Sequence, residues 1–281
     1  MSGEVTAARA AGAAGNAGVV QVTLRHSGKL NAMSRAMWFQ LRCVFESVQR
    51  SADVRCVLVA GEGGAFCAGG DISEYPAFRF EAAQLRNFHE NEVWGALQAM
   101  LDCDVPIVAC IAGACMGAGV EIASCCDVRI AGDTARFGAP IARLGFPMAP
   151  REAQLVAGAV GEVTARQMLL EAATFSAEQM LVRGFLGRVV DGNALEAEAL
   201  ATACRIAALA PGAARMNKQT LRALKLPPAL DGCALTAIKS RAALAAQAPT
   251  PAPAVDPYAY ADSAEHREGI GAFLAKRPPV F

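Results

Sequence analysis

The sequence of 281 residues predicts an α/β protein. Three observations support this class. Short apolar or alternating segments are separated by helical segments over the first half of the chain, and two of the apolar segments run directly into glycine-rich turns. After about residue 150 the pattern changes to helices alone. Alternating strands and helices are typical of a sheet with helices packed on its faces.

The first half of the chain begins with a strand, a helix and a second strand. Residues 19–25 (VVQVTLR) alternate and are β-branched, which predicts a strand. Ser34 is a suitable N-cap for a helix that extends to about Arg50, with apolar residues at helical spacing. Residues 54–60 (VRCVLVA) are almost continuously apolar, as is typical of a strand that is covered on both faces.

A glycine-rich turn separates this strand from the next helical segment. Apolar residues at helical spacing predict one helix over 82–102, and Pro106 ends it before a buried strand over 107–111 (IVACI). A second glycine-rich turn leads into another helical stretch, and residues 127–131 (DVRIA) form the next predicted strand. These segments complete a β–α–β core.

The rest of the chain is predicted to be helical. Ser176 and Gln179 resemble a capping box, and Pro211 suits the first turn of a helix. A proline-rich linker (APTPAPAVDP) precedes the last helical segment. The helices predicted in this part of the chain are 194–208, 211–225, 228–247 and 264–276.

The chain divides into three parts. Residues 1–18 are rich in Ala and Gly and predict a flexible N-terminal arm, for which an organelle transit peptide is the alternative interpretation. We expect an α/β core over 19–190 and a C-terminal helical region over 191–281. The arm contains no apolar stretch of the kind that secretory signals have.

Composition excludes several classes of protein. Lys+Arg and Asp+Glu both number 26, so the chain is not a globally basic nucleic-acid binder. The longest uncharged run, 105–120, is shorter than the ~18–20 apolar residues that span a bilayer. The ten cysteines form no CxxC pair and have no nearby His at zinc-finger spacing. We therefore expect a reduced, cytoplasmic protein without a membrane segment or a metal.

Several common catalytic motifs are absent. The segment HENEV at His89 does not match HExxH, and no GxSxG elbow is present. Neither glycine-rich turn matches a dinucleotide fingerprint or a P-loop. These absences argue against a zinc protease, an α/β-hydrolase, a dinucleotide enzyme and a Walker ATPase, and we expect no separate cofactor.

Two glycine-rich turns after buried strands form the candidate site. They are 66–71 (FCAGGD) and 113–119 (GACMGAG), and glycine lets a ligand approach backbone N–H groups closely. Two such donors from separate turns can form an oxyanion hole, and the dipole of the helix after the second turn would add positive potential. Glu121 lies in the first turn of that helix among apolar neighbours, where a carboxylate should have a perturbed pKa. The alternative interpretation is two packing turns and one capping glutamate.

The chain also resembles a known family over almost its whole length, except the arm and the linker. The matching segments are NAMS (31–34), GGAFCAGGDI (63–72), PIVACIAGACMGAGVEIASCCDVRIA (106–131), ARFGAPIARLGFP (135–147) and REGIGAFLAKRPPVF (267–281). In this order they are similar to the crotonase (enoyl-CoA hydratase/isomerase) superfamily. The resemblance implies a spiral of ββα turns and C-terminal helices that form homotrimers, often paired into hexamers. It also implies acyl-coenzyme A thioester substrates, so coenzyme A enters as part of the substrate.

The resemblance further implies roles for particular residues. Gly70 and Ala118 match the two backbone donors of the oxyanion hole, and Glu121 matches the first of the two glutamates of family hydratases. Coenzyme A would be bound by the first turn and by the C-terminal segment of a neighbouring subunit. The residues matched to that role are Ala68, Gly70, Phe273 and Lys276.

One departure from the family pattern affects the predicted reaction. Family hydratases have a second glutamate directly after the proline of the FGxP segment, where this chain has Ile141. Glu152 is a possible substitute, but nothing in the sequence places it in the site. We therefore expect an enoyl-CoA hydratase-like enzyme that uses Glu121. The alternatives are a superfamily isomerase, decarboxylase or thioester hydrolase, and, in another class, a CoA-thioester-binding subunit with little catalysis.

Overall fold

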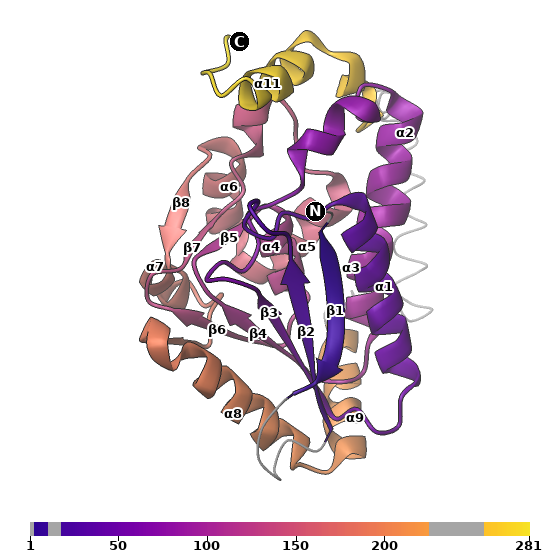
Figure 1. Cartoon of the computed structure of the whole chain (residues 1–281), viewed down its shortest axis with the longest axis vertical. Coiled ribbons are helices and arrows are strands. Elements are labelled where there is room, and N and C mark those ends of the chain that lie inside the picture. Colours follow the sequence, from indigo (N-terminus) through magenta and orange to yellow (C-terminus); the bar gives the residue numbers. More distant parts are fainter. Residues whose placement is uncertain (1–2, 11–17, 225–255) are drawn as a thin grey trace, which may run out of the picture.

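The computed structural model describes residues 3–10, 18–224 and 256–281. Its main sheet has six strands in the order β1-β2-β3-β4-β6-β9, and a small sheet has three in the order β5-β7-β8 (Figure 1). The strands are β1 Glu4–Arg9, β2 Val19–Arg25, β3 Cys56–Gly61, β4 Ile107–Ile111, β5 Ala114–Met116, β6 Val128–Gly132, β7 Arg136–Gly138, β8 Thr174–Ser176 and β9 Arg188–Val190. The predicted α/β class is confirmed.

Helices cover both faces of the main sheet, and this explains why β3 is apolar throughout. Val57 and Val59 of β3 belong to the core under α1 and α3, whereas Cys56 and Leu58 face α8. Figure 1 shows α8 on the opposite side of the sheet from α1 and α3. The α-helices are α1 Arg35–Arg50, α2 Ala82–Asn87, α3 Trp94–Asp102, α4 Ala118–Ser124, α5 Pro150–Val160, α6 Glu162–Leu170, α7 Ala177–Val182, α8 Leu195–Ala207, α9 Pro211–Ala223 and α11 Ala264–Leu274.

The predicted helix starts are confirmed. The Ser34 side chain accepts a hydrogen bond from the Met37 N–H at the start of α1. Ser176 and Gln179 form a reciprocal capping box at α7, which satisfies two backbone donors that the helix cannot use. Pro211 occupies the first turn of α9.

Part of the N-terminal arm forms a strand. Residues 4–9 form β1, which pairs antiparallel with β2, while the remaining pairs of the main sheet are parallel. Val5 is buried, and its N–H donates to Gln40 Oε1 at 2.8 Å. The prediction of a flexible arm is therefore wrong for residues 4–9, because pairing with β2 outweighs the weak local preference. Residues 11–17 lie outside the described part of the chain.

The single helix predicted over 82–102 is also wrong in detail. It consists of α2, a π-helical segment η2 over Phe88–Val93, and α3. A π-helical turn changes the direction of the side chains that follow and is often found at functional sites. Here it buries the side chain of His89.

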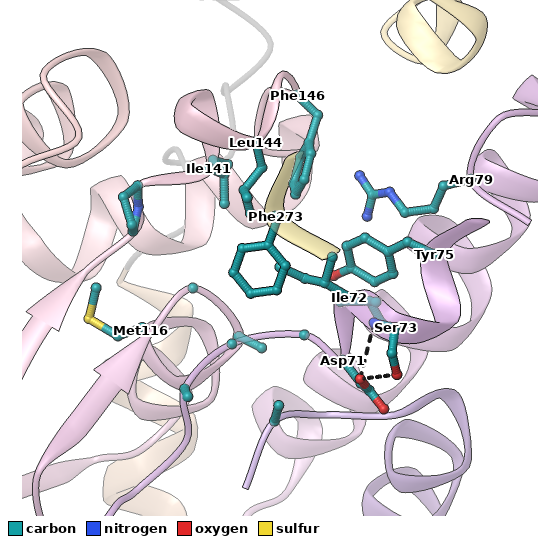
Figure 2. A pocket seen from close by; sticks show the side chains of 18 of the residues that line it. Asp71, Ile72, Ser73, Tyr75, Arg79, Met116, Ile141, Leu144, Phe146 and Phe273 are labelled. Carbon is teal, nitrogen blue, oxygen red and sulfur yellow. Dashed lines mark hydrogen bonds between the residues drawn. The ribbon is translucent and has the colours of Figure 1, made fainter. Parts of the chain in front are cut away.

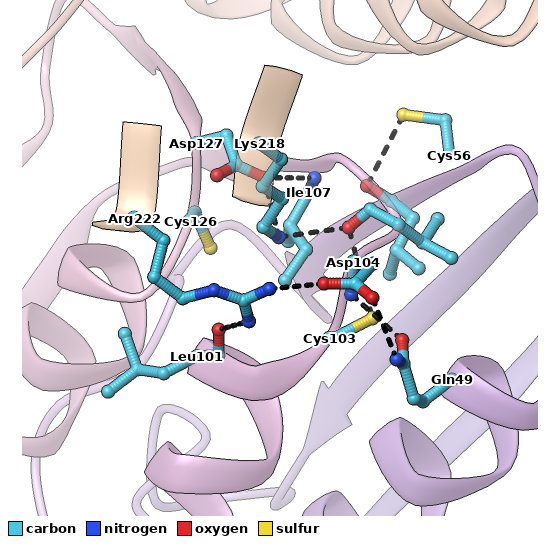
Figure 3. A network of polar contacts seen from close by, with 12 residues as sticks. Gln49, Cys56, Leu101, Cys103, Asp104, Ile107, Cys126, Asp127, Lys218 and Arg222 are labelled. Atoms are coloured by element: carbon cyan, nitrogen blue, oxygen red, sulfur yellow. Dashed lines mark hydrogen bonds and ion pairs between the residues drawn. The ribbon is translucent and has the colours of Figure 1, made fainter. Parts of the chain in front are cut away.

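A polar network fastens α9 to the core (Figure 3). Lys218 forms an ion pair with Asp127 at 2.8 Å and donates to the Val105 carbonyl, while Arg222 pairs with Asp104. The helix predicted over 228–247 and most of the linker lie outside the described residues. The division of the chain at residue 190 stays a prediction.

Three further features concern only the residues that the structure describes. No helix among them is long and apolar enough to cross a bilayer. No disulfide joins two of their cysteines, and no cluster of three or more of their His, Cys, Asp or Glu side chains could hold a metal ion.

Candidate active site

A cavity of about 680 Å³ contains the residues that the sequence singled out. It is bordered by the two glycine-rich turns, by α4, by the segment after β7 and by the end of α11. Six predicted site residues line it: Ala68, Gly70, Ala118, Glu121, Phe273 and Lys276.

Close packing of the two glycine-rich turns positions their backbone groups. Cys67 and Cys115 are bridged as in a parallel sheet, and the Met116 N–H donates to the Cys67 carbonyl at 2.8 Å. A Cβ on Gly119 would lie 2.5 Å from the Cys67 carbonyl oxygen, so a side chain there would push the turns apart. Gly117, which precedes α4, has φ +47°, a conformation that favours glycine.

Both predicted oxyanion donors remain available to a ligand. Ala118 is the first residue of α4, so its N–H has no partner within the helix. Within the described part of the chain, neither the Gly70 nor the Ala118 N–H donates to another group. Tyr75 Oη is close by, since it would lie 2.0 Å from a Cβ placed on Gly70.

Glu121 brings a carboxyl group into the cavity from a helix in which every residue is buried. Burial raises the pKa of Glu121 well above its ordinary value, and the nearby Glu152 carboxyl raises it further, while Arg79 acts in the opposite direction. Its side chain makes no hydrogen bond within the described residues, so the proton of the acid form is available for transfer.

Glu152, at the start of α5, is the second carboxyl group in the same cavity. Its side chain is 3% exposed, and Oε1 lies 2.8 Å from His89 Nδ1. Burial raises the pKa of Glu152 to about 8, against the opposing effect of Arg79. The sequence indicated Glu152 only as a possible substitute for the second glutamate, because an acidic residue in the first turn of a helix is ordinary.

His89 contacts Glu152 from the π-helical segment. Burial, helped by the charge of Arg79, lowers the pKa of His89 well below its ordinary value, so the imidazole is neutral near pH 7. A neutral imidazole orients the Glu152 carboxyl by one hydrogen bond without adding a positive charge.

Arg79 is a buried cation at the wall of the cavity, and the sequence did not point to it. The residue is 1% exposed. Its Cζ atom lies 4.4 Å from the ring centre of Tyr75 and 4.2 Å from that of Phe146. Figure 2 shows these three side chains together at one side of the cavity.

Asp71 has a local structural role. Its carboxylate accepts two hydrogen bonds from Lys29 Nζ, at 2.9 and 2.7 Å, and caps the turn at Ser73 (Figure 2). Burial by itself raises the pKa of Asp71, but the bonds from Lys29 and Ser73 outweigh it and lower the pKa below its ordinary value.

An apolar wall forms the other side of the cavity, as the isoleucine at position 141 suggested. Ile141, Leu144 and Phe273 lie around the central space in Figure 2. The side where family hydratases have a second glutamate is therefore apolar, and the second carboxyl group comes instead from α5.

The C-terminal helix covers the cavity of its own chain. Phe273 and Lys276 were expected to reach the site of a neighbouring subunit, yet both line the cavity of the chain to which they belong. The reason is the tight contact between α11 and the segment before α5. A Cβ on Gly269 would lie 2.2 Å from the Leu144 backbone, and one on Gly145 would lie 2.1 Å from the Glu265 carbonyl oxygen.

Comparison with known proteins gives a family over most of the chain. The model of the enoyl-CoA hydratase/isomerase family matches residues 14–281. A probable enoyl-CoA hydratase of Mycobacterium bovis is 29% identical over 260 residues, which cover 92% of this chain and 93% of the relative. A 2,3-dehydroadipyl-CoA hydratase of Escherichia coli is 30% identical over 263 residues and 94% of each chain.

The fold matches solved structures as well. The crystal structure of an enoyl-CoA hydratase/carnithine racemase from Magnetospirillum magneticum superposes with a TM-score of 0.74 at 31% identity. The match covers 94% of this chain and 92% of that one.

Proposed function

Because the chain belongs to the enoyl-CoA hydratase/isomerase family, we propose that it adds water to the double bond of a 2-enoyl-CoA thioester. One observation carries this proposal: two buried carboxyl groups, Glu121 and Glu152, share a cavity with two backbone donors that have no partner among the described residues. Hydration needs one group to take a proton from water and another to give a proton to carbon.

The thioester oxygen would accept hydrogen bonds from the N–H groups of Gly70 and Ala118. When the water oxygen adds to the β-carbon, the electrons of the double bond move onto that thioester oxygen as an enolate. Donors held in advance at this position stabilise the developing charge, and loss of one such donor typically costs ~10²–10³ in rate.

The carboxyl pair would handle both protons. Glu152 Oε1 lies 2.8 Å from the neutral His89 imidazole, whereas the Glu121 carboxyl has no hydrogen bond among the described residues and a pKa raised well above its ordinary value, so we assign Glu152 as the base and Glu121 as the acid. Ionised Glu152 takes one proton from water as the C–O bond forms, and protonated Glu121 gives its proton to the α-carbon. The product is the 3-hydroxyacyl-CoA thioester, and proton exchange with solvent restores the pair.

A purified-protein assay with three thioesters distinguishes this reaction from the alternatives. We expect hydration of crotonyl-CoA, which is measured by the loss of the enoyl absorbance and by detection of 3-hydroxybutyryl-CoA. Faster turnover of a 3-enoyl-CoA would indicate an isomerase. Release of CO₂ from a malonyl-type thioester would indicate a decarboxylase, and release of the free thiol of coenzyme A would indicate a hydrolase. Binding without turnover of any of them would show a CoA-thioester-binding subunit.

Substitution of the two carboxyl groups tests their roles. We expect Glu121→Gln and Glu152→Gln each to lower kcat for hydration by ~10²–10⁴, because the amide keeps the shape but cannot transfer the proton. The matched control is Glu162→Gln, since Glu162 is exposed at the start of α6. Undiminished hydration by either buried variant would contradict the role of that residue.

A further inference from the structure

The guanidinium of Arg79 lacks a partner for most of its hydrogen-bond donors. Arginine carries five N–H donors and stays charged in proteins. Among the described residues, its one side-chain hydrogen bond goes to Tyr260 Oη at 3.3 Å, and it forms no ion pair. Its Nε atom is fully buried and has no hydrogen-bond partner. Contact with the rings of Tyr75 and Phe146 stabilises the charge but accepts no N–H.

The groups that face Arg79 do not supply a fixed negative charge. Glu121 and Glu152 both feel its positive charge, but burial raises the pKa of both, and that of Glu152 to about 8. His89 and His266 also lie near Arg79, and burial lowers the pKa of each, so both are neutral near pH 7. Neither carboxyl group forms an ion pair or a hydrogen bond with Arg79 among the described residues, so most of its N–H donors are left for a ligand.

The other cations that line the cavity are either paired with a carboxylate or exposed to solvent. Lys29 is paired with Asp71. Arg143 and Lys276 are exposed. Among the described lining residues, Arg79 is thus the one buried cation, in the apolar part of the cavity where an acyl group would lie.

The position of Arg79 also indicates which part of a ligand would reach it. Tyr75 Oη lies beside Gly70, and the guanidinium of Arg79 lies over the ring of the same tyrosine. Asp71 is the last residue of the first glycine-rich turn. In Figure 2 the ring of Tyr75 lies closer to Asp71 than Arg79 does. The far end of an acyl group, rather than the atoms next to the thioester, would meet Arg79.

We propose that the acyl groups bound here end in a carboxylate, which Arg79 binds at the end remote from the thioester. This extends the proposed function by naming its substrate class, 2-enoyl-CoA thioesters with a terminal carboxylate. A carboxylate matches the planar fork of a guanidinium and would satisfy donors that the protein leaves unpaired.

Binding tests the proposal without requiring turnover. Calorimetry would compare saturated acyl-CoA thioesters in pairs that differ only in a terminal carboxylate or methyl group, over a ladder of chain lengths. At the best length we expect the carboxylate to lower the Kd by ~10-fold or more, as charge-assisted hydrogen bonds do. A methyl-ended thioester that binds equally well or better at every length would overturn the proposal.

Two variants and a control assign the preference to Arg79. Arg79→Met has a similar volume without the charge and should abolish the preference, whereas Arg79→Lys should keep part of it. Arg143→Met removes an exposed cation that lines the same cavity and should retain the preference. A preference that survives in folded Arg79→Met, as checked by circular dichroism and thermal melting, would overturn the assignment.

The two proposals fail in different ways. A carboxylate preference in binding, without hydration of any enoyl-CoA, would contradict the proposed reaction and leave the substrate class standing. Hydration of methyl-ended substrates, without any preference in binding, would contradict the substrate class and leave the reaction standing. In the second case Arg79 would serve only as the counter-charge of Glu121 and Glu152.

Discussion

At the scale of single residues, burial decides which charged groups have chemical roles. Glu152 and Glu162 lie on successive helices, yet the first is buried and the second is exposed. The pKa of the buried Glu152 carboxyl is raised, because its charged form loses its hydration. Asp71 shows the opposite outcome, since Lys29 and Ser73 stabilise its charge and remove it from the set of candidate proton carriers.

The raised pKa of Glu152 predicts how the rate depends on pH. Below about pH 8 this carboxyl is mostly protonated and cannot take a proton from water, and above that pH it is ionised. We therefore expect kcat/KM for hydration to rise as the pH increases through about 8. Stopped-flow measurement of kcat/KM at a series of pH values tests this expectation. The Glu152→Gln variant should lose the rise in kcat/KM near pH 8. A rate that is level from pH 6 upward would contradict the assigned base.

At the scale of elements, the main event is the docking of α11 on the segment that follows β7. Gly145 adopts φ +71° and Gly269 approaches the Leu144 backbone, so the two backbones come closer than side chains would allow. This contact brings the end of α11 to the cavity and makes Phe273 part of its wall.

Two glycines of α11 provide a matched test of that contact. In Gly269→Ala the new Cβ would lie 2.2 Å from the Leu144 backbone, so we expect a lower Tm and a raised KM for the acyl-CoA thioester. The control Gly271→Ala has open space around it and should be neutral or stabilising by up to ~1 kcal/mol. Equal effects of the two substitutions on KM would contradict a role of α11 in covering the cavity.

Lys276, just after α11, is predicted to meet a phosphate of coenzyme A. We expect Lys276→Ala to weaken acetyl-CoA binding up to ~5-fold at low salt, which is typical of an exposed ion pair, and Lys276→Arg to bind like the wild type. Added salt should remove the difference by screening. Titration calorimetry at two ionic strengths measures this, and an unchanged Kd for Lys276→Ala at low salt would leave Lys276 as a solvated surface residue.

At the scale of the whole molecule, α11, whose end borders the cavity, and α9 lie at opposite ends (Figure 1). The polar residues Lys218 and Arg222 of α9 contact the core, while Met216 and Leu221 are 62% and 63% exposed. A surface helix normally has its apolar side toward the core, so this reversed arrangement suggests that another copy of the chain covers the apolar side.

We therefore keep the prediction of a homotrimer or a hexamer. Light scattering should give three or six times the chain mass of 29.1 kDa at micromolar concentration. The physical reason is the free energy gained when exposed apolar side chains of α9 leave water. A stable monomer at that concentration would contradict this prediction.

Features that depend on neighbours along the chain were predictable from the sequence alone. Alternation and apolar runs marked the strands at 19–25 and 107–111, Ser34 and Ser176 marked helix starts, and the two glycine-rich turns marked the backbone donors. Local patterns suffice here because capping, turn conformation and the burial of a strand face are set within a few residues.

Which side chains meet in the cavity depends on contacts between segments that are far apart in the chain. Strand β1 forms because it pairs with the edge of β2. The π-helical segment that contains His89 brings its imidazole to Glu152, although 63 positions separate the two residues. Arg79 and Glu152 are ordinary charged residues in the sequence. Their chemistry arises from burial against segments far away in the chain, and the free energy of a buried charge depends on all the groups around it, which no local pattern encodes.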